Sequence, residues 1–83
     1  MATAGKEEKI LNEKIAIRIK QLRVEIEPIQ SKFAKEHLMD RQMLSRWENT
    51  KDNRGITIHS IFKFCKMINI SLKEFFDDDL FRK

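Results

Sequence analysis

Hydrophobic residues recur along this chain with the spacing of α-helices, in five successive segments. The first and longest segment runs from Ile10 to about Glu25. Its apolar stripe repeats after four, three and four residues and consists of Ile15, Ile19, Leu22 and Ile26. Arg23 lies at the edge of this stripe. Pro28 ends the helix, because the residue before a proline avoids helical backbone angles.

The stretch from Gln30 to Asn49 reads QSKFAKEHLMDRQMLSRWEN and predicts two short helices joined by a tight turn. Gln30 begins the first helix, and Asp40 can cap the second, because its carboxylate accepts hydrogen bonds from free N–H groups of the first turn. In the second helix Leu44 and Trp47 share one face. The polar residues lie away from that face: Arg41, Gln42, Ser45, Arg46 and Asn49. Such a helix is suited to contacting base edges and phosphates.

Two more helices are expected after a polar loop. Thr57 can cap a helix from Ile58 to about Ile68. Its predicted apolar face consists of Ile58, Ile61, Phe62, Cys65 and Ile68, widened by Phe64 and Met67. Ser71 and Glu74 fit a capping box, in which each side chain bonds the backbone N–H of the other residue. A short fifth helix follows.

The length of 83 residues indicates one domain. Two glycines and one proline, with 41% hydrophobic and 36% charged residues, favour an all-α fold. Residues 1–9 are expected to form a flexible lead-in, residues 10–80 the helical domain and residues 81–83 a tail. No window holds the ~18 consecutive apolar residues of a membrane span, and Cys65 is the only cysteine. We therefore expect a cytoplasmic protein without an intrachain disulfide.

The charge balance is compatible with a nucleic-acid partner but does not prove one, since 17 Lys and Arg against 13 Asp and Glu give +4. Residues 71–83 hold three basic and four acidic residues, so they carry −1 and should face away from a polyanion. His37 and His59 have no cysteine or second histidine at metal-binding spacing, and the run Asp77–Asp79 is typical of a solvated surface. The sequence predicts no enzyme, metal, cofactor or small-molecule ligand.

Several spaced motifs together resemble one family. They are IKQLR (Ile19–Arg23), Gln30, FAKE (Phe33–Glu36), DRQMLSRWEN (Asp40–Asn49) and ISLKEFF (Ile70–Phe76). In this order they resemble the XRE family, the helix–turn–helix transcriptional regulators typified by phage lambda repressor and Cro. The resemblance covers about Ile15 to Phe76. It implies a five-helix, lambda repressor-like DNA-binding domain that acts as a small transcriptional regulator, with repression as the expected mode.

By this resemblance the helix from Arg41 to Asn49 would enter the major groove of double-stranded DNA. Four residues are expected at base-reading positions: Arg41, Gln42, Ser45 and Arg46. Five are expected to bind backbone phosphate: Gln30, Asn49, Lys51, Asn53 and Arg54. The chemistry agrees, because arginine pairs with guanine and glutamine with adenine through two hydrogen bonds. For Arg41 and Arg46 the alternative is ordinary solubilising charge.

Three expectations concern how this unit is held together. Glu48 lies beside Trp47 near the core, where an unpaired charge would be costly, and the resemblance implies a structural salt bridge with Arg23. Leu38 stands where the turn of the family usually has glycine, so either a leucine adopts a positive φ or the turn is altered. Ile29 leaves the first short helix without a side-chain cap.

A homodimer is expected, because the last third of the chain has more apolar residues than a small core can hide. They are Phe64, Met67, Phe75, Phe76, Leu80 and Phe81. The alternative is that these residues complete the core. The alternative function is a protein-binding module on the same fold, such as an antitoxin or an adaptor without DNA recognition, although Arg41, Gln42 and Arg46 favour DNA.

Overall fold

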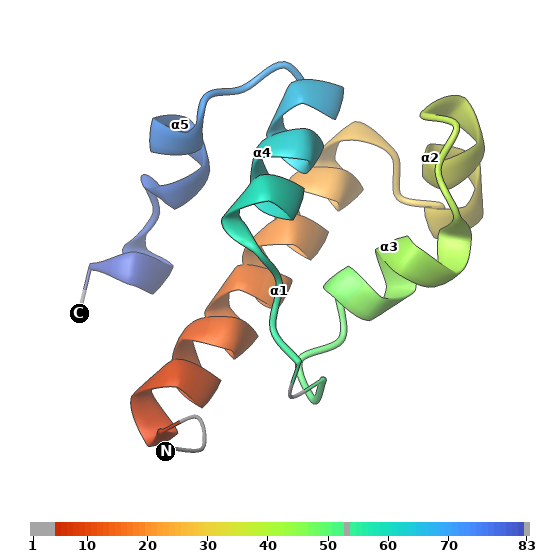
Figure 1. Cartoon of the computed structure of the whole chain (residues 1–83). Helices are drawn as coiled ribbons and strands as arrows, with labels where there is room; N and C mark the ends of the chain where they lie inside the picture. Colours follow the sequence, from red (N-terminus) through yellow and green to blue (C-terminus); the bar gives the residue numbers. More distant parts are fainter. Residues whose placement is uncertain (1–4, 53, 83) are drawn as a thin grey trace.

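The computed structural model describes residues 5–52 and 54–82, and these residues form helices and loops without a strand. The elements are α1 (Lys6–Ile26), α2 (Gln30–Glu36), α3 (Arg41–Trp47), α4 (Ile58–Met67), α5 (Leu72–Phe76) and the short 3₁₀ helix η1 (Asp79–Phe81). The prediction of an all-α domain is confirmed. Figure 1 shows α1 crossing the molecule, with α2 and α3 on one side and α4, α5 and η1 on the other. Within the described ranges, no helix has the length and apolar character needed to cross a membrane.

The two ends of the chain differ from the prediction. Helix α1 begins at Lys6, so residues 6–9 belong to it instead of to a lead-in. Glu7 and Glu8 lie in its first turn, where negative charge favours the N-terminus of a helix. At the other end Phe81, predicted to begin a tail, lies in η1 and packs against the hydrophobic core. The helical domain is therefore longer at both ends than the pattern indicated.

The helix caps follow the sequence closely. The Asp40 carboxylate accepts a hydrogen bond from the Gln42 N–H at 2.9 Å, and the Thr57 hydroxyl accepts one from the Ser60 N–H at 3.1 Å. Ser71 and Glu74 complete the predicted capping box, with bonds of 3.0 and 2.9 Å. Helix α2 begins after Ile29 without a side-chain cap, as expected.

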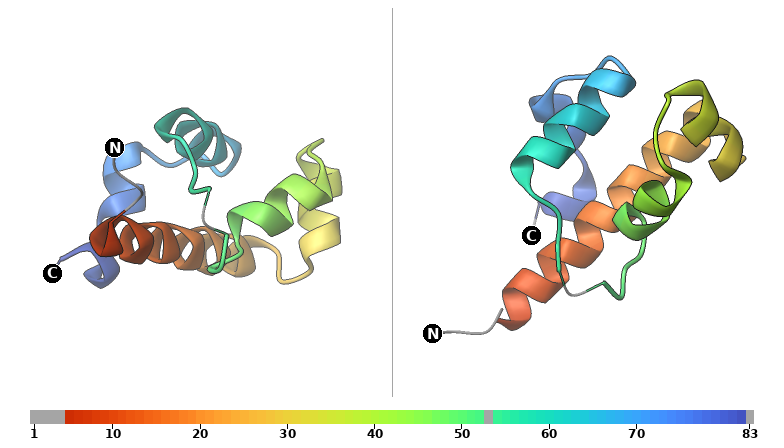
Figure 2. Two further views of the ribbon diagram at one scale, coloured as in Figure 1. Left: turned by 60° about the horizontal axis from the view of Figure 1, so that its bottom comes forward. Right: turned by 45° about the vertical axis from the view of Figure 1, so that its right-hand side comes forward.

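Phe64 of α4 lies at the centre of the core. Its ring centroid is 6.2 Å from that of Phe33 in α2, 6.4 Å from Trp47 in α3 and 6.3 Å from Phe75 in α5. One apolar cluster therefore joins helices from both sides of α1, and the views in Figure 2 show how α4 lies between α5 and α3. The cluster consists of Ile15, Ile19, Phe33, Ala34, Leu44, Trp47, Ile61, Phe64, Cys65 and Phe75.

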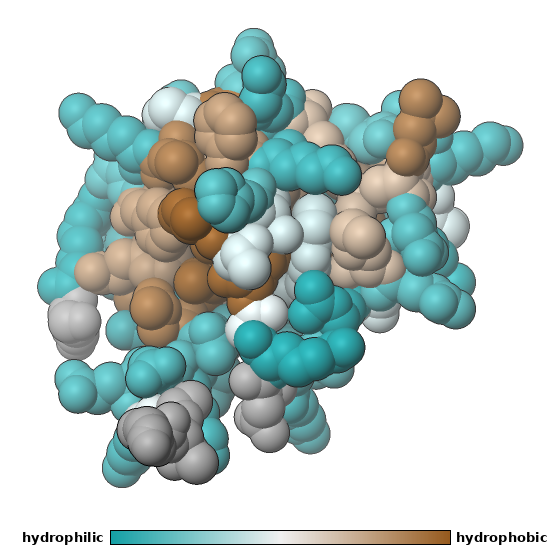
Figure 3. Space-filling view, in the orientation of Figure 1, coloured by the Kyte–Doolittle hydropathy of each residue, from teal (hydrophilic) through white to brown (hydrophobic). Residues whose placement is uncertain are grey.

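The predicted inner face of α4 is wrong in two places. Ile58 and Phe62 are about half exposed, at 51% and 50%, whereas Phe64 is wholly buried. Apolar side chains gather over this part of the molecule in Figure 3. The helix is rotated so that Ile61, Phe64 and Cys65 face inward. Both alternatives repeat at three and four residues, so periodicity alone could not choose between them.

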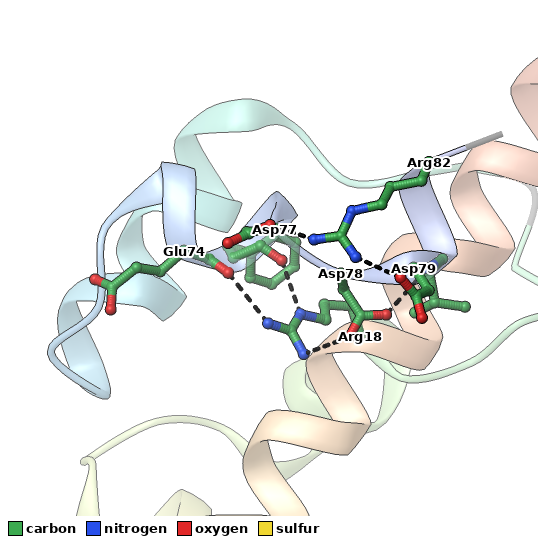
Figure 4. A network of polar contacts seen from close by, with 8 residues as sticks. Arg18, Glu74, Asp77, Asp78, Asp79 and Arg82 are labelled. Atoms are coloured by element: carbon green, nitrogen blue, oxygen red, sulfur yellow. Dashed lines mark hydrogen bonds and ion pairs between the residues drawn. The ribbon is translucent and has the colours of Figure 1, made fainter.

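Arg18 fastens the C-terminal elements to α1. Its Nε donates to the Phe75 carbonyl oxygen at 2.7 Å, its Nη2 to the Glu74 carbonyl oxygen at 3.1 Å, and its Nη1 pairs with Asp78 at 3.3 Å (Figure 4). Arg82 pairs with Asp77 and Asp79. The acidic run is thus bound to two arginines, and it lies across α1 from α2 and α3.

Candidate nucleic-acid interface

Helix α3 has one anchored face and one free face. Leu44 is wholly buried and Trp47 nearly so. On the opposite side the predicted base-reading residues Arg41, Gln42 and Ser45 are exposed. Met43, which is 41% exposed, lies beside them. The burial of the apolar face therefore fixes which side chains α3 presents to solvent.

The connection between α2 and α3 resolves the two alternatives for Leu38. Its φ is 53°, so the leucine adopts the left-handed conformation. The Leu38 N–H bonds the Lys35 carbonyl at 3.2 Å and the Met39 N–H bonds the Ala34 carbonyl at 2.9 Å. This pair of bonds is the Schellman motif, which ends helices through a left-handed residue, usually glycine. The turn is therefore closed by a Schellman motif with a leucine at the left-handed position.

A buried salt bridge ties α3 to α1. Arg23 Nε and Nη2 each donate to one carboxylate oxygen of Glu48, both at 2.8 Å. The side chains are only 4% and 5% exposed. Arg23 Nη1 also donates to the carbonyl oxygens of Glu27, at 3.2 Å, and Pro28, at 2.7 Å. The hydrogen bonds to Glu48 raise the pKa of the Arg23 guanidinium. The pair expected from the sequence is present, and it also holds the α1–α2 connection.

Gln30 is not a free side chain. Its Nε2 donates to Glu48 Oε1 at 3.1 Å, so this amide belongs to the same polar cluster as Arg23. The primary amide has two N–H donors, which leaves one for another partner. Gln30 therefore begins α2 in a position set by Glu48, a contact that sequence reasoning missed.

The loop after α3 is shaped by its own side chains. Asn49 Oδ1 accepts a hydrogen bond from the Lys51 N–H at 2.9 Å, and Asp52 Oδ1 accepts one from the Arg54 N–H at 2.9 Å. Both are bonds to the backbone two residues on, as in Asx turns. The side chains of Lys51 and Arg54 are exposed. Asn53, also predicted to bind phosphate, lies outside the described residues.

Two of the predicted DNA-contacting arginines are paired with Asp52. Arg54 Nη2 lies 2.8 Å from Asp52 Oδ2 and Arg54 Nε lies 3.1 Å from Oδ1. Arg46 Nη1 lies 3.8 Å from Asp52 Oδ2 and donates to the Gly55 carbonyl oxygen at 3.3 Å. Hydrogen bonds from Arg54 hold the pKa of Asp52 at about 2. Arg46 thus reaches toward the loop, with 32% of its side chain exposed, and differs from the freely exposed Arg41.

The loop then passes close to α1 at Gly55. Its φ is 72°, a conformation that favours glycine, and a Cβ atom there would lie 3.0 Å from Asn12 Oδ1. Gly55 therefore allows the loop to approach α1, and its carbonyl oxygen accepts the hydrogen bond from Arg46 of α3. Asn12 is a further residue whose part in this arrangement the sequence did not indicate.

The resulting surface combines α3 with the following loop. Arg41, Gln42 and Ser45 present donors and acceptors from a fixed helix, and Lys51 and Arg54 add exposed positive charge. Among the described residues, no group of three metal-ligating side chains is found. Comparison with family models, curated proteins and solved structures finds no match to this chain.

Proposed function

We propose that this protein binds double-stranded DNA sequence-specifically, as a small helix–turn–helix transcriptional regulator. The observation that carries the proposal is the anchoring of α3. Leu44, Trp47 and the Arg23–Glu48 pair hold the helix from one side. The other side presents Arg41 and Gln42 to solvent. A rigid helix with exposed Arg and Gln suits the major groove, where these side chains distinguish guanine and adenine.

In this proposal α2 and α3 form the helix–turn–helix of a lambda repressor-like domain. Ser45 and Arg46 join Arg41 and Gln42 in reading bases, and repression follows from occupying an operator. Backbone phosphates are bound by the residues around the start of α2 and in the loop: Gln30, Asn49, Lys51, Asn53 and Arg54. Phosphate contacts position the protein, while base contacts specify the sequence. No catalytic step, cofactor or small-molecule ligand is part of the proposal.

The test begins with selection of bound sequences from a random DNA pool, followed by a salt series on the selected site. Log K should fall with log salt by about 0.9 for each phosphate neutralised. Arg41→Ala should lose about 1–3 kcal/mol of discrimination at one base position. Lys51→Ala should weaken binding to all sequences about equally. Lys73→Ala removes the same charge from α5, on the other side of α1, and serves as the matched control.

The alternative function is a protein-binding module of the antitoxin or adaptor kind. The observation that favours it is the apolar surface of α4, where Ile58 and Phe62 are half exposed. An absence of DNA binding even at low salt would support this alternative. Loss of discrimination in Arg41→Ala would support DNA binding, because α4 carries no part of that readout.

We also propose that the protein acts as a homodimer, through a surface that shares only Phe76 and Phe81 with the set the sequence suggested. Phe64 and Phe75 are wholly buried, so they complete the core and cannot form an interface. Ile10 and Leu11 of α1 are 42% and 45% exposed. They line a hollow with Glu7, Lys14, Phe76 and Phe81. Exposed apolar groups with a polar rim are typical of interfaces.

The charges around this hollow are self-complementary. Glu7 and Lys14 lie at equal distances along α1 on either side of Ile10 and Leu11. If two copies of α1 pack antiparallel about a two-fold axis at this point, Glu7 of each copy faces Lys14 of the other. Such an isologous contact repeats every pair twice. It leaves α3 and its loop free for DNA, because they lie on the other side of the molecule from α5 and η1.

A further inference from the structure

Asp52 lies among the cationic groups proposed to meet DNA. Its side chain is only 11% exposed, although it sits in a surface loop. Both carboxylate oxygens are engaged: Oδ1 by the Arg54 N–H and Nε, and Oδ2 by Arg54 Nη2. Arg46 approaches Oδ2 from α3 at 3.8 Å. Asp52 is thus the common partner of the two arginines.

The contact between Asp52 and Arg54 has the form that a phosphate contact would take. A guanidinium binds carboxylate or phosphate through two parallel N–H···O bonds, and here Nε and Nη2 occupy both carboxylate oxygens. A DNA phosphate that approached Arg54 would have to replace these bonds. The free energy that Arg54 contributes to DNA binding is then the difference between its contact with phosphate and its lost contact with Asp52. This contribution is smaller than that of an arginine without a carboxylate partner.

We propose that Asp52 competes with DNA phosphate for Arg54, and so lowers the affinity of the protein for DNA of every sequence. This inference rests on the proposed function. Within the described part of the chain, Arg41, Gln42 and Lys51 form no hydrogen bond or ion pair with the Asp52 side chain, so their contributions to binding are unaffected. DNA binding therefore depends more on contacts with bases, and less on contacts with the DNA phosphate backbone, than the number of arginines on this surface indicates.

A purely structural role for Asp52 makes the opposite prediction. The bond from the Arg54 N–H to Oδ1 shapes the loop, and its loss would weaken DNA binding if the loop itself makes contacts. Asp52→Asn separates the two roles, because the amide oxygen can still accept this N–H while the negative charge is gone. Competition with phosphate predicts that Asp52→Asn binds DNA more tightly than wild type. A purely structural role of Asp52 predicts equal or weaker binding.

The experiment compares wild type, Asp52→Asn and Glu13→Gln by fluorescence anisotropy on random-sequence duplex DNA. Glu13 is an exposed carboxylate of α1 without an ion pair within the described residues, so Glu13→Gln matches the change in net charge. For one additional phosphate contact, log K of Asp52→Asn should be steeper in log salt by about 0.9. Its advantage over wild type should therefore grow about 3.5-fold as salt falls from about 200 mM to about 50 mM.

A double-mutant cycle shows whether the effect passes through Arg54. Arg54→Ala should weaken the wild type little, because Asp52 already occupies that guanidinium, and should weaken Asp52→Asn several-fold more. Equal losses in both backgrounds would overturn the proposal. So would an affinity and a salt slope for Asp52→Asn that match those of Glu13→Gln.

Retention on phosphocellulose separates failure of this inference from failure of the proposed function. If no form binds duplex DNA at about 50 mM salt, the proposed function fails. Competition with phosphate still predicts that Asp52→Asn elutes from the phosphocellulose column at higher salt than wild type and Glu13→Gln. If wild type binds DNA but Asp52→Asn gains on neither substrate, the proposed function stands and the role assigned to Asp52 is wrong.

Discussion

Arg23 connects three parts of the candidate interface through one guanidinium. Two of its nitrogens bind Glu48 at the end of α3, and the third binds the backbone between α1 and α2 at Glu27 and Pro28. Glu48 in turn receives the Gln30 amide. Every strong hydrogen-bonding group of the buried pair therefore has a partner, which is the condition for burying two charges without a large loss of stability.

Arg23→Met should destabilise the protein by about 3 kcal/mol, because it leaves the Glu48 carboxylate buried without its cation. In a domain of this size that loss lowers the thermal midpoint by more than about 10 °C. Thermal unfolding followed by circular dichroism measures it. The double variant Arg23→Met, Glu48→Leu is the control and should recover most of the loss, since replacing a buried ion pair by apolar groups is often neutral. An unchanged midpoint in Arg23→Met would contradict the structural role.

At the scale of elements, helices α2 and α4 both end in a Schellman motif. Leu38 and Asn69 have φ values of 53° and 61°, and each begins a turn closed by two backbone bonds to the preceding helix. Asparagine tolerates this conformation, whereas leucine does so at a cost of roughly 1–2 kcal/mol. Leu38 gains nothing from burial, since its side chain is 95% exposed. The tight turn of the proposed DNA-binding motif is therefore strained at one position.

Leu38→Gly should raise stability by about 0.5–1 kcal/mol. Relief of the left-handed strain exceeds the extra backbone entropy that glycine adds to the unfolded chain, which is about 0.4–1 kcal/mol. Urea unfolding monitored by Trp47 fluorescence provides the measurement. Leu38→Ala is the matched control, because it removes the same exposed side chain but keeps the Cβ atom. If alanine stabilises as much as glycine, backbone strain is not the cause.

Local features were predictable from the sequence, and most contacts between distant elements were not. The Arg23–Glu48 pair was expected only because the sequence resembles a known family. The caps at Asp40, Thr57 and Ser71 depend on side chains bonding to nearby backbone, so short motifs reveal them. The orientation of α4 was not predictable, because two sets of apolar residues share the same helical spacing. The role of Arg18 was not predictable, because its carbonyl partners lie 56 and 57 residues away along the chain. The role of Asp52 likewise depends on a loop conformation that no pattern encodes.

At the scale of the whole molecule, different kinds of surface lie on opposite sides of α1. The α3 helix and its loop present the cationic and hydrogen-bonding groups, whereas α5 and η1 hold the acidic residues bound by Arg18 and Arg82 (Figures 1 and 4). If α3 and its loop meet DNA as proposed, the acidic C-terminal residues face away from it. This arrangement also places the apolar hollow beside Phe76 and Phe81 where a second copy could bind without covering α3.

Leu11→Glu should abolish self-association through this hollow. Placing a charge at the centre of an apolar contact loses the burial of leucine, about 1.5 kcal/mol or more, so the dimer dissociation constant should rise at least about tenfold. Sedimentation equilibrium over a range of concentrations measures this constant. Val24→Glu is the matched control, because Val24 is 40% exposed on α1 but does not line the hollow.

The antiparallel arrangement itself makes a sharper prediction about charge. Lys14→Glu should weaken the dimer by placing like charges opposite each other at both symmetry-related contacts. Combining it with Glu7→Lys should restore the dimer, because opposite charges meet again with their positions exchanged. Recovery is specific to a two-fold contact centred near Leu11, since other uses of this surface would not pair residue 7 with residue 14. If the double variant associates no better than Lys14→Glu alone, the copies do not meet in this way.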